Sequence, residues 1–149
     1  MAFSPNGQIL ATASDDNTAK LWDVQSGLEI RTIGLSDRVM GVAFSPDGNR
    51  LVIASADSTA KLYDIEGGGL GLIRDLAGHT LEVATVAYSP DGAYIATGSY
   101  DGTTKLWSTA TGNEERTYTR ASTKQVRTQE LLDHDSKSRE KISHEFRSV

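Results

Sequence analysis

The sequence contains no cysteine, and it is poor in proline and aromatic residues. The lack of cysteine excludes disulfide bonds, thiolate metal ligands and cysteine nucleophiles. No apolar run approaches the roughly 20 residues that a membrane-spanning helix needs. The first residues, MAFSPNGQ, lack the basic and then apolar regions of a signal peptide. We therefore expect an intracellular protein, cytoplasmic or nuclear, with no membrane partner.

Positive charge is also scarce. The 149 residues include 15 Lys and Arg against 20 Asp and Glu, which gives a formal net charge of -5. Proteins that bind nucleic acid or anionic membranes without sequence specificity need clustered cations to neutralise phosphates. The charge balance therefore argues against both kinds of partner.

Three segments of the chain match one another without gaps. They are AFSPNGQILATASDDNTAKLWD from Ala2, AFSPDGNRLVIASADSTAKLYD from Ala43 and AYSPDGAYIATGSYDGTTKLWS from Ala87. In each, an aromatic residue is followed 19 positions later by a second one: Phe3 and Trp22, Phe44 and Tyr63, Tyr88 and Trp107. The units recur after 41 and then 44 residues, and the extra residues fall in a glycine stretch at 67–69. Such fixed spacing indicates a repeated supersecondary unit.

Each unit has the pattern of short strands separated by turns, with no helical periodicity before residue 120. Ser-Pro-Asp/Asn-Gly tetrapeptides begin at Ser4, Ser45 and Ser89, and they suit tight turns because proline presets φ and glycine tolerates a positive φ. Later strands are expected at 9–14, 18–23 and 29–33, at 51–55, 59–64 and 71–76, and at 94–99, 103–108 and 114–119. Each unit is therefore predicted to be a four-stranded antiparallel meander.

The repeats resemble the WD-repeat (WD40) β-propeller family. The resemblance is carried by the period of 41 to 44 residues, the Trp22-Asp23 dipeptide and the Gly78-His79 pair before a strand. It implies an all-β fold of three four-stranded antiparallel blades over residues 1–120, divided as 1–33, 34–76 and 77–120.

The resemblance also implies a buried hydrogen-bond chain in each blade. In the family it joins the His of the Gly-His pair, a Ser or Thr of the second strand, the Asp of the next turn and the Trp of the third strand. In the third unit these are His79, Ser99 or Thr97, Asp101 and Trp107. A buried indole and imidazole each need a partner, and a turn Asp can accept from both His and backbone N–H groups. Parts of the set recur as Ser14, Asp16 and Trp22 and as Ser55, Asp57 and Tyr63.

The three copies are not equivalent. Alignment of Gly34-Leu35 with Gly78-His79 places Leu where the His belongs, and Tyr63 replaces the Trp, so the second network is expected to be incomplete. The first unit begins at Met1, near the end of its innermost strand. The first blade is therefore expected to be truncated.

Ser99, Asp101 and His79 could also be taken for a hydrolase triad. We favour the structural role because parts of the set recur in all three units, and active sites are rarely triplicated. The glycine-rich stretch at 67–71 lacks the order of a phosphate-binding loop. Neither Asp15-Asp16 nor Asp133-His134-Asp135 has the oxygen series of a calcium loop. We predict no enzyme activity, no cofactor and no metal.

Three blades are too few to close a propeller, which needs about four to eight. We expect an open arc that exposes the flat faces of its terminal blades. Two explanations stay open: the chain is a fragment of a larger propeller, or copies associate through the exposed faces, as when a dimer supplies six blades. The truncated first blade favours the fragment.

The pattern changes from residue 121. Residues 121–149 have no Gly or Pro and carry many charges of both signs. Ile142, Phe146 and Val149 fall at helical spacing, whereas His134 and His144 lack metal-ligand spacing. We expect a disordered or partly helical tail, the alternative being a helix docked on a blade face.

Together these features predict a protein-interaction scaffold that presents rim loops to protein or peptide partners. The family's binding rim, carried over to this sequence, comprises Arg38, Tyr100, Asp37, Glu82 and Asp15, with Leu81 and Ala56 beside them. Arg38 and Tyr100 are the first candidates, since Arg and aromatic side chains contribute most contact energy. The alternative is the repeat portion of a larger multidomain signalling protein or enzyme, not active by itself.

Overall fold

The Ser-Pro-Asp/Asn-Gly turns close the first hairpin of each sheet. In the second of them, the Gly48 N–H donates to the Ser45 carbonyl at 2.9 Å, with Gly48 at φ 78°. The Ser45 hydroxyl accepts from the Arg50 N–H, also at 2.9 Å. Glycine takes this left-handed conformation without steric cost, so the tetrapeptide defines where the chain reverses.

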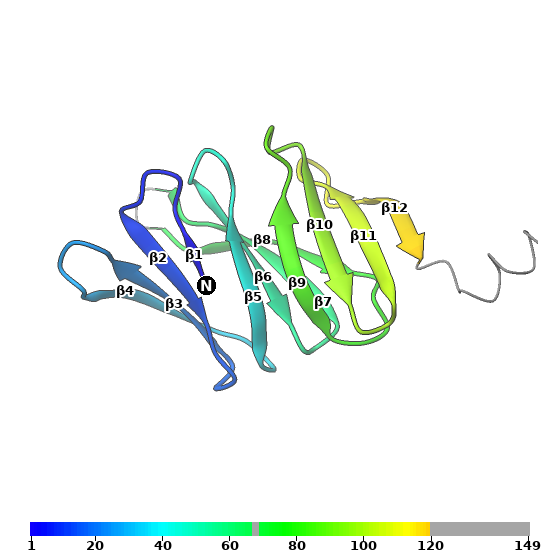
Figure 1. Ribbon diagram of the computed structural model, residues 1–149, viewed down its shortest axis with the longest axis horizontal. Coiled ribbons are helices and arrows are strands. Elements are labelled where there is room, and N and C mark those ends of the chain that lie inside the picture. Colours follow the sequence, from blue (N-terminus) through cyan, green and yellow to red (C-terminus); the bar gives the residue numbers. More distant parts are fainter. Residues whose placement is uncertain (67–68, 120–149) are drawn as a thin grey trace, which may run out of the picture. The chain divides into compact units, whose positions relative to one another are not determined.

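The structure is a computed structural model and describes residues 1–66 and 69–119. The chain forms three four-stranded antiparallel sheets, here called blades 1 to 3, each with its strands in chain order (Figure 1). Blade 1 contains β1 (Ala2–Phe3), β2 (Ile9–Ala13), β3 (Thr18–Asp23) and β4 (Glu29–Gly34). Blade 2 contains β5 (Val39–Phe44), β6 (Arg50–Ser55), β7 (Thr59–Asp64) and β8 (Gly71–Ala77). Blade 3 contains β9 (Val83–Tyr88), β10 (Tyr94–Ser99), β11 (Thr103–Ser108) and β12 (Glu114–Thr119).

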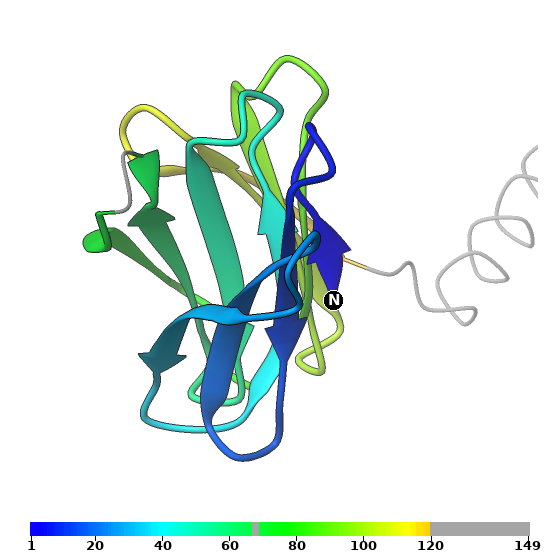
Figure 2. The same cartoon turned by 90° about the vertical axis from the view of Figure 1, so that its left-hand side faces the viewer.

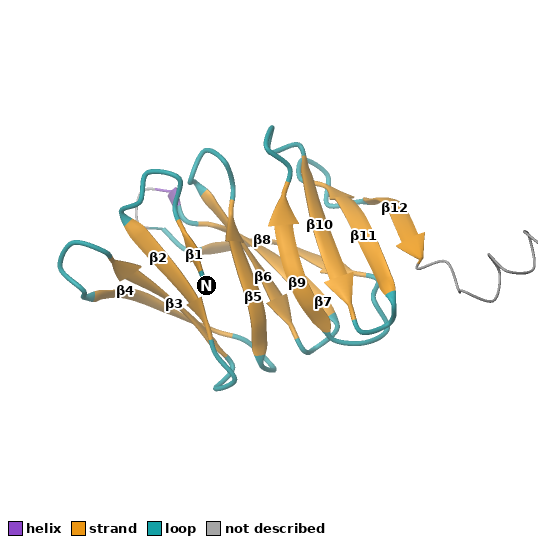
Figure 3. Cartoon of the chain, viewed as in Figure 1, coloured by secondary structure: helices purple, strands orange, loops and turns teal. Residues whose placement is uncertain are grey.

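The predicted all-β class and the four-stranded meanders are confirmed. Apart from a short helical segment at Glu66, the described residues form strands and loops (Figure 3). The three blades stand side by side without closing into a ring, as expected for an open arc (Figure 1). The expected tail at 121–149 lies outside the described residues.

The blades are copies in backbone as well as in sequence. The register between the third and fourth strands shifts between Leu21 and Trp22, between Leu62 and Tyr63, and between Leu106 and Trp107. A bulge at the same repeat position redirects the chain beside the same aromatic residue in each blade.

Two apolar clusters join the blades, one at each junction. Strand β6 contributes to both, because Leu51 and Ile53 belong to the cluster with blade 1, and Val52 and Ala54 to the cluster with blade 3. All four side chains are fully buried. Among the described residues, the middle blade is therefore covered on both faces, whereas each terminal blade is covered on one.

Loops gather at the two ends of the strands (Figure 2). One end, the Asp-turn rim, carries the turns after β2, β6 and β10 and the links from β4 to β5 and from β8 to β9. The other end, the Pro-turn rim, carries the turns after β1, β5 and β9 and those after β3, β7 and β11. The candidate partner-binding residues lie on the first of these rims.

Candidate functional site

A continuous hydrogen-bond chain crosses blade 3 from its third strand to the Asp-turn rim. The indole Nε1 of Trp107 donates to Thr97 Oγ1 at 2.8 Å, and Thr97 Oγ1 lies 2.7 Å from His79 Nε2. His79 Nδ1 lies 2.8 Å from Asp101 Oδ2. The side chain of His79 is fully buried and that of Asp101 is 8% exposed. The structure thus brings four of the predicted residues into one chain.

The geometry selects one tautomer of His79. With the proton on Nδ1, the imidazole donates to Asp101 and its Nε2 accepts from the Thr97 hydroxyl, whose oxygen in turn accepts from the indole. Every buried donor and acceptor of the chain is then used. Burial opposes ionisation of Asp101, but hydrogen bonds from Thr103, His79 and the Thr80 N–H outweigh it and hold the pKa of Asp101 well below its ordinary range.

Ser99 is placed elsewhere. Its hydroxyl donates to the Leu81 carbonyl at 3.0 Å and accepts from the Asp101 N–H at 3.1 Å. It is therefore engaged in the rim loops and is not the bonding partner of His79, so the three residues do not form the relay of a hydrolase triad. Of the two hydroxyl residues considered from the sequence, Thr97 is the one in the chain.

Blade 1 contains a shorter version of the chain. Trp22 Nε1 donates to Thr12 Oγ1 at 3.0 Å, while the Ser14 hydroxyl accepts from the Asp16 N–H at 3.3 Å. Asp16 Oδ1 accepts from the Thr18 N–H and hydroxyl, at 3.0 and 2.6 Å. Trp22 and Thr12 are only half-buried, because they lie on the uncovered face of this blade.

Blade 2 replaces the chain with apolar side chains and an ion pair. Ile53 stands at the position of Thr97, and Tyr63 packs in the cluster with blade 1. The turn residue Asp57 accepts from the Ser36 hydroxyl at 2.6 Å and lies 3.5 Å from Lys61 Nζ. Burial opposes ionisation of Asp57, but bonds from Ser36 and Thr59 and the charge of Lys61 lower its pKa to about 2. The Ser55 hydroxyl accepts from the Asp57 N–H at 3.2 Å.

Thr12, Ser36 and Lys61 were not singled out from the sequence. A signal for Thr12 and Thr97 exists, because residues two apart on a strand share a face. Ile95 pairs with Trp107, and Thr97 is two residues further along, on the face of the indole. No comparable signal marks Ser36, since its bond to Asp57 spans 21 positions of the chain.

The links between blades form a second candidate site on the Asp-turn rim, at the junction of blades 2 and 3. Arg38 Nη2 donates to Glu82 Oε1 at 2.8 Å, across 44 positions in the sequence. Leu81 lies on the same link as Glu82, and Tyr100 lies in the adjacent turn after β10, with exposed fractions of 51% and 63%. Tyr100 N–H donates to the Glu82 carbonyl at 3.1 Å. We call Arg38, Leu81, Glu82 and Tyr100 the rim patch.

The other predicted rim residues surround this patch or lie further away. Asp37 accepts from the Arg38 N–H at 2.7 Å, and the Ala56 N–H donates to the Arg38 carbonyl at 2.9 Å. Asp15 is exposed in the turn after β2, on blade 1. The structure therefore gathers Asp37 and Ala56 around Arg38, and leaves Asp15 on another blade.

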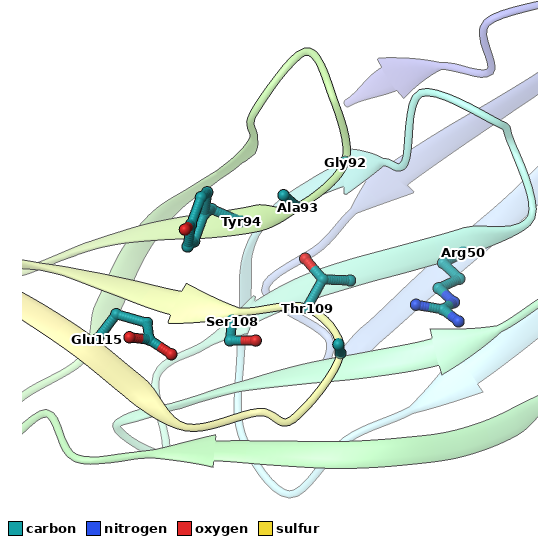
Figure 4. A pocket seen from close by; sticks show the side chains of 8 residues that line it. Arg50, Gly92, Ala93, Tyr94, Ser108, Thr109 and Glu115 are labelled. Carbon is teal, nitrogen blue, oxygen red and sulfur yellow. The ribbon is translucent and has the colours of Figure 1, made fainter.

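A pocket of about 410 Å³ opens on the Pro-turn rim, beside blade 3 (Figure 4). Its lining residues are Arg50, Gly92, Ala93, Tyr94, Ser108, Thr109, Ala110 and Glu115. The hydroxyls of Thr109 and of Tyr88, on β9, are buried without a hydrogen-bond partner among the described residues, and burial raises the pKa of Tyr88. The equivalent positions of blade 2 hold Ile65 and Phe44. None of the site residues predicted from the sequence lines this pocket.

Within residues 1–66 and 69–119, no three or more His, Asp or Glu side chains are grouped as metal ligands. In the same part of the chain, no helix is long and apolar enough to cross a bilayer.

The repeats of this chain are similar to those of known proteins. The family WD40, described as "WD domain, G-beta repeat", matches residues 1–23, 28–64 and 71–108, more than half of the chain. A curated relative, the Ribosome biogenesis protein BOP1 homolog of Aedes aegypti, is 44% identical over 43 residues. Those residues are 29% of this chain and 5% of that protein, so the chain matches only a small part of the relative's length.

Each family match contains one of the three aromatic pairs. The matches at 28–64 and 71–108 each begin with the fourth strand of one blade and end with the third strand of the next. WD40 repeats generally act as non-catalytic scaffolds that bind other proteins. On these grounds the chain belongs to the WD40 family of β-propeller repeats.

Proposed function

We propose that the chain is a scaffold that binds a protein or peptide partner at the rim patch. The observation that carries the proposal is the pair of exposed side chains, Leu81 and Tyr100, beside the Arg38–Glu82 ion pair. Aromatic, Arg and large apolar side chains grouped in this way supply most of the contact energy of protein interfaces.

The loops that carry the patch are held in place before any partner binds. Ser99 donates to the Leu81 carbonyl, and the Tyr100 N–H donates to the Glu82 carbonyl. Asp101, one residue further on, is held by His79 and by the Thr80 N–H. Loops that are already ordered lose little conformational entropy on binding. The buried chain of blade 3 therefore supports the rim patch without touching a partner itself.

The charge around the patch indicates the chemistry of the partner. Asp37 adjoins Arg38, and Asp15 and Asp16 are exposed on the same rim. Arg38 is already paired with Glu82, so the rim has an excess of negative charge. The proposed partner segment carries an apolar or aromatic side chain next to Lys or Arg, which suits such a surface electrostatically.

The test compares the wild-type chain with Leu81→Ala+Tyr100→Ala and with Leu28→Ala+Tyr94→Ala. The control pair also removes exposed apolar side chains, but on the Pro-turn rim. Each tagged protein is incubated with a lysate of its source cells, and bound proteins are quantified by mass spectrometry. We expect a specific set of partners to fall by about tenfold or more with the first variant, because hot-spot side chains contribute about 2 kcal/mol each.

The control variant should recover the same partners as the wild type. Unchanged recovery of every specific partner by Leu81→Ala+Tyr100→Ala, with thermal stability equal to that of the control, would contradict the proposal. Mixing each variant with a basic, Tyr- or Leu-containing peptide from a recovered partner then tests the proposed chemistry.

A second candidate is that these blades are the repeat portion of a larger multidomain protein. The observation that favours it is the match to 5% of a long relative named for ribosome biogenesis. An intracellular location, nuclear if the second candidate holds, stays a prediction. Sequencing the transcript on both sides of the segment that encodes these residues distinguishes the candidates. An in-frame catalytic or assembly domain favours the second candidate.

A further inference from the structure

Each blade has two unlike faces. On the face toward the preceding blade, three residues lie opposite one another across the first three strands. In blade 2 these are Phe44, Leu51 and Tyr63, at most 8% exposed against blade 1. In blade 1 the equivalent row is Phe3, Leu10 and Trp22. No described blade covers this row, and Phe3 is 62% exposed.

The opposite face of each blade carries smaller and aliphatic residues. Ala11, Leu21 and Ile33 of blade 1 pack in the cluster with blade 2. Val52, Leu62 and Leu76 of blade 2 pack in the cluster with blade 3. The equivalent residues of blade 3 are Ala96, Leu106 and Tyr118, of which Tyr118 is 49% exposed. Among the described residues, the array therefore ends in an uncovered aromatic row at blade 1 and in an uncovered face at blade 3. We call the second one the aliphatic face, although Tyr118 stands there in place of the Leu76 of blade 2.

The prolines of the turns repeat this asymmetry. A β-carbon on Gly48 would lie 3.4 Å from Pro5 Cδ, and one on Gly92 would lie 3.5 Å from Pro46 Cδ. The proline of each blade thus packs on the turn glycine of the next blade. Nothing lies within 4 Å of the equivalent position at Gly7, and Pro90 of blade 3 is not among the nearest atoms of any described glycine. One glycine and one proline are left at opposite ends.

A polar contact between blades has the same direction. Arg74 of blade 2, which pairs with Leu62 in register, donates to the Ala110 carbonyl of blade 3 at 3.0 Å. Arg116 of blade 3 pairs with Leu106 in the same register and is exposed. The residue of blade 1 that corresponds to Ala110 is Gln25, also exposed. Its carbonyl is the matching acceptor.

We propose that blade 3 of one copy of this chain docks on blade 1 of a second copy, head to tail. Both internal junctions serve as templates, because each pairs an aromatic row with an aliphatic face and a turn glycine with a proline. The terminal faces hold the two unmatched halves of such a junction. Two copies joined twice in this way contain six blades, within the range at which propellers close. The assembly is then a dimer with two equal junctions.

The test measures the mass of the full chain in solution by sedimentation velocity. Phe3→Asp blocks the aromatic row and Tyr118→Asp blocks the aliphatic face, each at an exposed position that leaves the internal junctions intact. The wild type should sediment as a dimer. Each variant alone should be a monomer, with dimer affinity lowered by about 100-fold or more, because a buried unpaired carboxylate is costly.

An equimolar mixture of the two variants gives the sharpest result. Phe3→Asp keeps a functional blade 3 face and Tyr118→Asp keeps a functional blade 1 face, so the mixture should form a one-to-one dimer that is held by one intact junction and is weaker than the wild-type dimer. Contact between like faces would instead leave one of the variants dimeric by itself. Leu72→Asp, an exposed substitution on β8 away from both faces, is the matched control and should stay dimeric.

The proposal is overturned if the wild type sediments as a monomer over about a hundredfold range of concentration. That result is expected if another part of the chain or another protein covers the terminal faces. Aggregates of many sizes that neither substitution changes overturn it as well. Because Phe3 and Tyr118 lie outside the rim patch, loss of the dimer and loss of the rim partner are separable results.

Discussion

Blades 2 and 3 share one backbone and hold it together by different chemistry. In blade 3, His79 and Thr97 link the turn carboxylate to the buried indole of Trp107. In blade 2, the corresponding positions hold Leu35, Ile53 and Tyr63, and these residues pack against blade 1 without such a chain. Both turns nevertheless hold the following Thr through the same carboxylate bonds.

The comparison shows two ways to fill the same positions of a blade without leaving a buried polar group unpaired: the hydrogen-bond chain of blade 3 and the apolar packing of blade 2. A buried polar group costs free energy unless every partner is present, whereas an apolar replacement of all partners can be nearly neutral. Blade 2 keeps the turn carboxylate Asp57 with other partners, and the His, Thr and Trp of the chain are replaced together by Leu35, Ile53 and Tyr63. Partial replacement in blade 3 should therefore be worse than complete replacement.

The largest effect is expected from Thr97→Val. Valine fills the space but removes the hydroxyl that joins the imidazole and the indole, which leaves the Trp107 N–H and His79 Nε2 buried and unpaired. We expect the free energy of unfolding to fall by about 2 to 4 kcal/mol. Urea denaturation at one fixed protein concentration measures it.

Two further variants complete this experiment. Ile53→Val, at the equivalent position of blade 2, should cost only about 1 kcal/mol, since no polar partner is lost. His79→Leu+Thr97→Ile+Trp107→Tyr copies the residues of blade 2 and should be more stable than Thr97→Val alone. If the triple variant were the less stable of the two, the polar chain would stabilise blade 3 by more than the pairing of its own buried donors and acceptors.

An intermediate effect is expected from acid. The pKa of Asp57 is lowered to about 2 in the folded chain, below the roughly 3.9 of an unfolded Asp. Its contribution to stability is therefore present above about pH 4 and is lost as the pH falls toward 2. The lowered pKa of Asp101 acts in the same direction. We expect Asp57→Asn to flatten the loss of unfolding free energy between pH 5 and pH 2 by about 1 kcal/mol.

Urea denaturation at a series of pH values measures this loss. Ser36→Ala keeps the carboxyl group but removes one of its hydrogen bonds, so its acid loss should lie between those of the wild type and Asp57→Asn. Identical pH profiles for the wild type and Asp57→Asn would show that the turn of blade 2 draws no stability from its charge.

The smallest effect concerns the residue after each turn Asp. Ser58 of blade 2 has φ 71°, and Gly102 of blade 3 has φ 82°. A left-handed conformation costs a side-chain-bearing residue about 1 kcal/mol. Ser58→Gly should therefore stabilise the chain by a few tenths of a kcal/mol, and Gly102→Ser should destabilise it by about 1 kcal/mol. Thermal unfolding curves of both variants test whether their stability changes have opposite signs. Changes of equal sign would contradict backbone strain at this position.

Particular residues show how far the sequence could be interpreted. The strands were predictable because alternating side chains and the Ser-Pro-Asp/Asn-Gly turns are local signals. Spacing along the strand favoured Thr97 over Ser99, but the bond from the Ser99 hydroxyl to the Leu81 carbonyl was not predictable, since it follows a register shift between Gly98 and Ser99 and joins two different loops. Arg38 and Glu82 were both proposed as rim residues, but their pairing depends on two links brought together by the junction.

The sequence by itself determined the repeated blade, because the constant interval between aromatic residues and the turn tetrapeptides act within one unit. The tertiary structure decided which faces are covered. Trp107 is 2% exposed because blade 2 packs on it, whereas Trp22 has the same local surroundings and stays half-buried. Burial depends on the neighbouring blade, and that contact lies between residues far apart in the chain.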